Sequence, residues 1–144
     1  MENEDTIKLL RECSAGVKMG VATIDELLPH VQDPKFKDVL YSSKTTHEKI
    51  YADINDYLHK YDVPKKDPPV IASSMAKMKT DMQIAMHKSD KTIADIITDG
   101  CNTGVKSLTR YLNEYGTANE NVKHLTKRLI DSEEKLIESI KDYL

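Results

Sequence analysis

The sequence lacks tryptophan, has a single phenylalanine and contains no long apolar run. Two cysteines and five glycines occur among its 144 residues. Hydrophobic residues make up 39% and charged residues 31%, a balance typical of a globular helical protein and not of a disordered chain. No stretch approaches the roughly 20 apolar residues that cross a bilayer, so we expect no membrane segment.

An excess of charge of one sign is also missing. The formal net charge is −3, and acidic and basic residues alternate along the chain. No basic face stands out that could neutralise a nucleic-acid backbone, which argues against nucleic-acid binding. The first ten residues, MENEDTIKLL, are acidic and lack the apolar core of a signal peptide. We therefore expect a cytoplasmic protein with reduced cysteines.

Hydrophobic periodicity predicts two helices in the first half, with no strand pattern anywhere. The first covers about residues 5–28 and ends at Pro29. Asp33 and Pro34 begin the second, since Asp caps free backbone N–H groups and Pro suits a first helical turn. The turn between the helices is short, so they should pack antiparallel.

Residues 62–70, DVPKKDPPV, carry three prolines and predict an extended linker. A helix over about 70–88 follows, and its methionines at 75, 78, 82 and 86 share one face. That face suits packing, although an adaptable partner surface or a soft-metal path stays open. Ser89 and Asp90 either cap a new helix or lie within a continuous one. Helices over about 90–115 and 120–143 complete the chain, with Thr117 and Glu120 as a capping box.

Two pairs of segments indicate an internal repeat. Residues 13–18, CSAGVK, match 101–106, CNTGVK, at four of six positions. Residues 47–58, HEKIYADINDYL, match 133–144, EEKLIESIKDYL, at six of twelve positions. The matches follow the same order, which favours one duplicated helical hairpin over a solenoid.

The duplication predicts an all-α, four-helix bundle as a single domain over residues 1–144. Hairpin one covers about 5–60, hairpin two about 90–144, and 61–89 form a crossover with an extra helix. A helix of about 18 residues rises about 27 Å, close to the length of a bundle. Such a crossover would return the chain to the opposite end before the second hairpin starts.

In an antiparallel hairpin, residues equally far from the turn lie at the same height. Counting outward from each predicted turn in this way brings several side chains to the middle of the bundle. The candidates are Cys13, His47, Glu48, Cys101, Glu133 and Glu134, with Gly16 and Gly104 beside them. His47 and Glu133 both fall on apolar stripes, and the repeat aligns them. Buried polar groups need partners, so a hydrogen-bonded pair of these two side chains is the plainest interpretation. A metal site is the alternative, with His47 and Glu133 joined by Glu48, Glu134, Glu12, Cys13 or Cys101.

The duplicated hairpin, the crossover and the central polar layer resemble the ferritin-like superfamily. The likeness covers nearly the whole chain and is strongest to small bacterial bundles that lack the di-iron motif. Di-iron members place Glu on helices one and three, and Glu-x-x-His on helices two and four. Glu-x-x-His occurs nowhere in this sequence, and Lys44 stands three residues before His47 where that motif has Glu. The resemblance therefore implies the fold without the di-iron chemistry.

These observations favour a non-enzymatic bundle with a binding or structural role, forming a homodimer through a helix face. The alternative is a metal-binding or redox protein with a divergent site around His47 and Glu133. No cofactor is expected in the first case, and Fe, Mn or Zn in the second.

Overall fold

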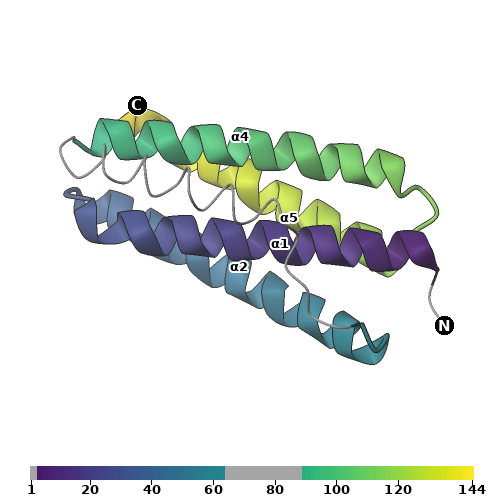
Figure 1. Ribbon diagram of the computed structural model, residues 1–144. Coiled ribbons are helices and arrows are strands. Elements are labelled where there is room, and N and C mark those ends of the chain that lie inside the picture. Colours follow the sequence, from purple (N-terminus) through teal and green to yellow (C-terminus); the bar gives the residue numbers. More distant parts are fainter. Residues whose placement is uncertain (1–2, 64–88) are drawn as a thin grey trace.

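The computed structural model describes residues 3–63 and 89–144, and within them the chain is helical with no strand (Figure 1). The four long helices are α1 (Glu4–Leu27), α2 (Pro34–Lys60), α4 (Asp90–Glu114) and α5 (Glu120–Ser139). Two short 3-10 turns follow α1 and α5, η1 (Leu28–His30) and η2 (Lys141–Tyr143). The predicted four-helix bundle is confirmed. The predicted helix at 70–88 and its methionine face lie outside the described residues.

The boundaries of the first hairpin follow from local chemistry. The Asn3 side chain accepts a hydrogen bond from the Thr6 N–H at 2.8 Å and starts α1. Asp33 caps α2 by accepting from the Lys35 and Phe36 N–H groups at 2.7 and 3.2 Å, as predicted. Asp62 ends the hairpin with a positive φ of 54°, and this left-handed residue stops α2.

The second hairpin departs from two sequence-based predictions. The cap of α5 is Asn119, whose side chain accepts from the Val122 N–H at 2.9 Å; the predicted capping box at Thr117 is wrong. Thr117 instead donates its hydroxyl to the Asp5 carboxylate at 2.6 Å, because the turn packs against the start of α1. The last helix ends at Ser139, and a 3-10 turn replaces its predicted continuation to Tyr143.

Each helix lies antiparallel to its hairpin partner, and the hairpins pack so that α1 contacts α4 and α2 contacts α5 (Figure 1). One end of the bundle joins Tyr61 to Asn119 through a 2.9 Å hydrogen bond. The opposite end joins Gln32 to Asp90, whose carboxylate accepts the Gln32 N–H at 2.8 Å. Consequently α2 ends and α4 begins at opposite ends of the bundle. The predicted crossover between those ends falls on residues 64–88, which lie outside the described residues.

Both ends are closed by an aspartate from the other hairpin. Asp5, in the first turn of α1, accepts the Thr117 N–H at 3.1 Å as well as its hydroxyl. Asp90, in the first turn of α4, accepts the Asp33 N–H at 2.9 Å in addition to that of Gln32. Each aspartate thus satisfies backbone donors in the turn of the opposite hairpin, which fixes the hairpins relative to each other.

The apolar core consists of two clusters. The first gathers the half of the bundle near Asn119, and the second gathers the half near Asp90. On every helix a polar or glycine position separates them: Gly20, His47, Gly104 and Glu133. We call these four residues the polar layer. Burial of the apolar side chains in the two clusters supplies the main stabilisation of the fold, and the polar layer interrupts this apolar core at one height in the bundle.

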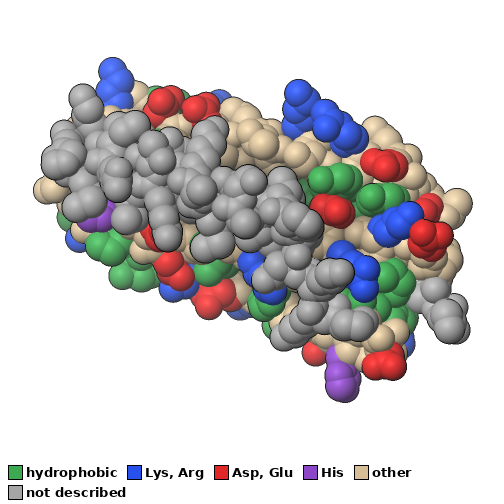
Figure 2. All heavy atoms as spheres, in the orientation of Figure 1, with side chains coloured by type: hydrophobic (Ala, Val, Ile, Leu, Met, Phe, Trp, Pro, Cys, Tyr) green, Lys and Arg blue, Asp and Glu red, His purple; other side chains and the backbone are tan. Residues whose placement is uncertain are grey.

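The outer surface carries both signs of charge. On the face in Figure 2, acidic and basic side chains intermingle over the part that the structure describes. Among those residues, the large hydrophobic side chains that remain exposed are Tyr41 and Leu144, at 55% and 50%. No helix in the described ranges is both long enough and apolar enough to cross a membrane.

Candidate functional site

A buried imidazole–carboxylate pair lies at the centre of the polar layer. His47, on α2, is 1% exposed, and Glu133, on α5, is 8% exposed. The His47 Nε2 and Glu133 Oε1 atoms are 2.9 Å apart. The predicted pair is therefore confirmed, and it bridges the two halves of the repeat.

The second ring nitrogen of His47 fixes where the protons lie. His47 Nδ1 is 2.8 Å from the Ser43 backbone carbonyl, which can only accept a hydrogen bond. Nδ1 must therefore carry a hydrogen and donate it. One more proton then lies between Nε2 and the Glu133 carboxylate, and the pair is neutral overall whichever atom holds it.

Glu133 sets the direction of the His47 pKa. Burial disfavours the charged ring and by itself would lower this pKa. The hydrogen bond to Glu133, its negative charge and the Ser43 carbonyl outweigh burial, so the pKa of His47 is raised above its ordinary value. Glu133 thus favours the imidazolium form of the ring more than water would.

Two glycines make room for the pair, and a thiol lies beside it. A Cβ atom on Gly20 would lie 3.3 Å from the His47 Cδ2 atom, closer than side chains normally pack. A Cβ on Gly104 would meet Glu133 at 3.7 Å, an ordinary contact. The Cys101 thiol hydrogen-bonds to Glu133, and burial together with that charge raises the pKa of Cys101. Cys101 is therefore a neutral thiol.

The other predicted ligands lie away from the pair. Cys13 contacts the Thr126 hydroxyl at 3.1 Å, within the first core cluster, and burial raises the pKa of its thiol to about 12. Glu12 accepts a hydrogen bond from the Tyr111 hydroxyl between α1 and α4. Glu48 and Glu134 are exposed on the bundle surface.

Side-chain direction explains why Cys13 and Gly16 miss the layer. Helical side chains lean toward the N-terminus of their own helix. On α2 that direction leads to the turn, so the His47 ring meets Gly20, which is nearer the turn than Gly16. On α1 the lean toward the helix N-terminus leads away from the turn, so the Cys13 side chain points away from the height of the His47 ring. Gly16 faces Leu129 instead, with 4.0 Å between its Cβ position and Leu129 Cδ2.

The polar layer and the adjacent Cys101 thiol thus bring together three of the predicted ligands: His47, Glu133 and Cys101. Within residues 3–63 and 89–144, no group of three or more His, Cys, Asp or Glu side chains has the arrangement of a metal site. The chemistry that the geometry directly supports is proton sharing between a base and an acid away from water.

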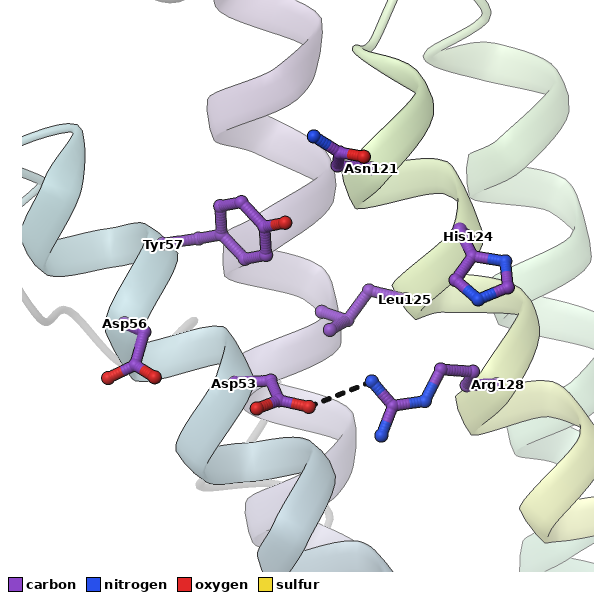
Figure 3. A pocket seen from close by; sticks show the side chains of 7 residues that line it. All are labelled: Asp53, Asp56, Tyr57, Asn121, His124, Leu125 and Arg128. Carbon is purple, nitrogen blue, oxygen red and sulfur yellow. Dashed lines mark hydrogen bonds and ion pairs between the residues drawn. The ribbon is translucent and has the colours of Figure 1, made fainter.

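The surface between α2 and α5 forms a groove with two hollows. The first, of about 330 Å³, is shown in Figure 3. Its floor is Leu125 and its walls are polar, with Tyr57 and Asp56 from α2 and His124 from α5. Arg128 reaches across and bonds to Asp53 at 2.8 Å, as the dashed line shows (Figure 3).

A second hollow of about 290 Å³ continues the groove along α5 and shares Arg128 with the first. Lys49 and Lys135 line it from opposite helices, and Ser132 lies at its inner side. The sequence analysis did not identify these residues. The signal was present, because Lys49 and Lys135 are one of the identical pairs in the second repeated segment.

Comparisons with known proteins support the fold alone. No protein-family model and no curated protein matches the sequence. The structure is similar to a crystal structure of a DUF305 fragment from Deinococcus radiodurans, with a TM-score of 0.77. That match covers 98% of this chain and 95% of the other at 10% sequence identity. The likeness extends over the whole architecture.

Proposed function

We propose that this chain is a non-enzymatic, ferritin-like helical bundle with a binding or structural role. The observation that carries the proposal is that both ring nitrogens of His47 already have protein partners, Ser43 and Glu133. A buried base and acid that satisfy each other fix the register of the two hairpins without a metal. We further expect this bundle in the cytoplasm, as a homodimer through a helix face.

A metal-binding or redox role is the second candidate, and one feature of His47 favours it. Metal-ligating histidines commonly donate one ring N–H to a carbonyl and bind through the other nitrogen. His47 has this orientation, with Nδ1 on the Ser43 carbonyl and Nε2 toward Glu133. Fe, Mn or Zn would then replace the shared proton, and Cys101 would be the nearest further ligand.

Metal analysis separates the two proposals. The protein is purified without chelator, and Fe, Mn and Zn are quantified against protein concentration. The binding or structural proposal expects less than about 0.1 metal per chain and an unchanged melting temperature after chelator treatment. One equivalent of metal that is lost in His47→Ala and Glu133→Ala, and retained in the exposed control Glu134→Ala, would establish the second candidate instead.

A further inference from the structure

The second hollow between α2 and α5 is built from two copies of one short motif. Residues 46–49 read Thr-His-Glu-Lys, and residues 132–135 read Ser-Glu-Glu-Lys. The two motifs occupy equivalent positions in the repeat. Their buried members are His47 and Glu133, and their hydroxyl and Lys members line the hollow from both sides. The hollow therefore lies beside the pair, where the two halves of the repeat face each other.

Within the part of the chain that the structure describes, the two lysines of this hollow form no ion pair with an acidic side chain. Lys49 and Lys135 nevertheless line one cavity. Arg128 also lines it and pairs through Nη1 with Asp53, while Asp131 is the one acidic group in the lining. Both lysines are exposed on facing helices, and an anion in the hollow between them would be attracted by both charges.

A hydroxyl donor completes the inner side of the hollow. Ser132 Oγ lies 3.5 Å from His47 Nδ1, which already donates to the Ser43 carbonyl. Because Nδ1 carries a hydrogen, it cannot accept the Ser132 proton. No acceptor for this hydroxyl occurs among residues 3–63 and 89–144, so Ser132 can donate to a ligand in the hollow.

We propose that this hollow binds the phosphate group of a small soluble phosphomonoester, with Lys49, Lys135 and Ser132 as donors. Phosphate suits the site because it carries more than one negative charge and several acceptor oxygens at neutral pH. The hollow is open to solvent, so the attached organic group can extend out of it. The assignment rests on the proposed function, since it gives the binding role a ligand class.

Solution NMR of the full chain tests the site directly. Inorganic phosphate and glycerol phosphate are titrated at constant ionic strength while the backbone amides and the His47 ring are observed. The expected result is saturable shifts at Lys49, Ser132, Lys135 and the His47 ring, with glycerol phosphate binding at least as tightly as phosphate. Shifts that depend only on ionic strength, or shifts centred elsewhere, would overturn the assignment.

Charge-matched variants provide the control. Lys49→Gln with Lys135→Gln should weaken binding at least tenfold, because each loses a charge-assisted hydrogen bond. Lys35→Gln with Lys127→Gln removes two exposed lysines from the same helices outside the hollow and should change the dissociation constant less than about twofold. Equal losses in the two double variants would refute a specific site.

Two further arms keep the source of the phosphate and the proposed function separate. Ser132→Ala should weaken binding about threefold to tenfold while leaving both lysines in place. Binding to phosphatidic-acid vesicles without any response to glycerol phosphate would overturn the soluble ester as ligand. Metal content is measured on the same preparation, so a failure of the phosphate site remains distinguishable from a failure of the metal-free proposal.

Discussion

Replacing His47 with leucine tests the buried pair most directly. At 2.9 Å and an effective dielectric constant of about 20, the imidazolium and carboxylate attract each other by about 6 kcal/mol. Removal of the charged ions from water offsets much of this gain. The variant loses the attraction but leaves the Glu133 carboxylate 8% exposed. We therefore expect the free energy of unfolding at pH 7 to fall by about 3–5 kcal/mol.

A second replacement should return most of that loss. Glu133→Met in the His47→Leu background removes the stranded charge and fills similar volume with an unbranched apolar side chain. Both neighbouring core clusters are apolar, so the new side chains would join them into one. We expect the double variant to lie within about 2 kcal/mol of the parent protein, or above it.

Urea unfolding followed by the helical circular dichroism signal measures these differences. The parent protein and the two variants should show equal denaturant slopes, which establishes that they unfold from equally compact states. A cost of His47→Leu below about 1 kcal/mol at pH 7 would refute the charge-pair reasoning.

Three further predictions concern the same layer and the thiols. The pKa of His47 is raised in the fold, so the stabilisation that its charged form contributes is complete below its unfolded pKa near 6.5 and is lost as pH rises through its folded pKa. Urea midpoints measured across that pH range, compared with those of a variant lacking His47, test this contribution. Gly20→Ala should destabilise the fold by about 1–2 kcal/mol, because the added Cβ would press on the His47 ring. Gly100→Ala should stabilise the fold by up to about 1 kcal/mol, because no neighbour lies within 4 Å of the added Cβ. Thermal melts of the two variants decide both signs. Cys13 and Cys101 should resist alkylation at pH 8 until urea unfolds the chain, since burial raises both thiol pKa values; alkylation of the native protein at the rate of a free thiol would contradict this.

Most of the fold could be predicted because its determinants are local. Periodicity located the helices, and Asp33 with Pro34 located one of their starts, since a cap depends on residues only three positions apart. The turn at Thr117 was missed because its hydroxyl bonds to Asp5, which is 112 positions away. A contact of that separation leaves no local pattern for sequence analysis to detect.

The site was predictable to the extent that the repeat encodes it. Alignment of the halves placed His47 against Glu133, and the structure has that contact. Counting residues from the turns could not identify Gly20 as the neighbour of the ring, because such counting ignores the lean of side chains along a helix. The lysines of the groove were overlooked because exposed charges on a helix usually indicate solvent contact alone.

The contact between His47 and Glu133 also has a consequence for the origin of the chain. These residues are counterparts in the two halves, and counterparts that contact each other must lie near the axis that relates those halves. In a symmetric dimer of one ancestral hairpin, any residue at that position would meet its own copy. A homodimer could set histidine against histidine or glutamate against glutamate, but never one against the other. Joining both hairpins in one polypeptide is what allows a base and an acid to share this position.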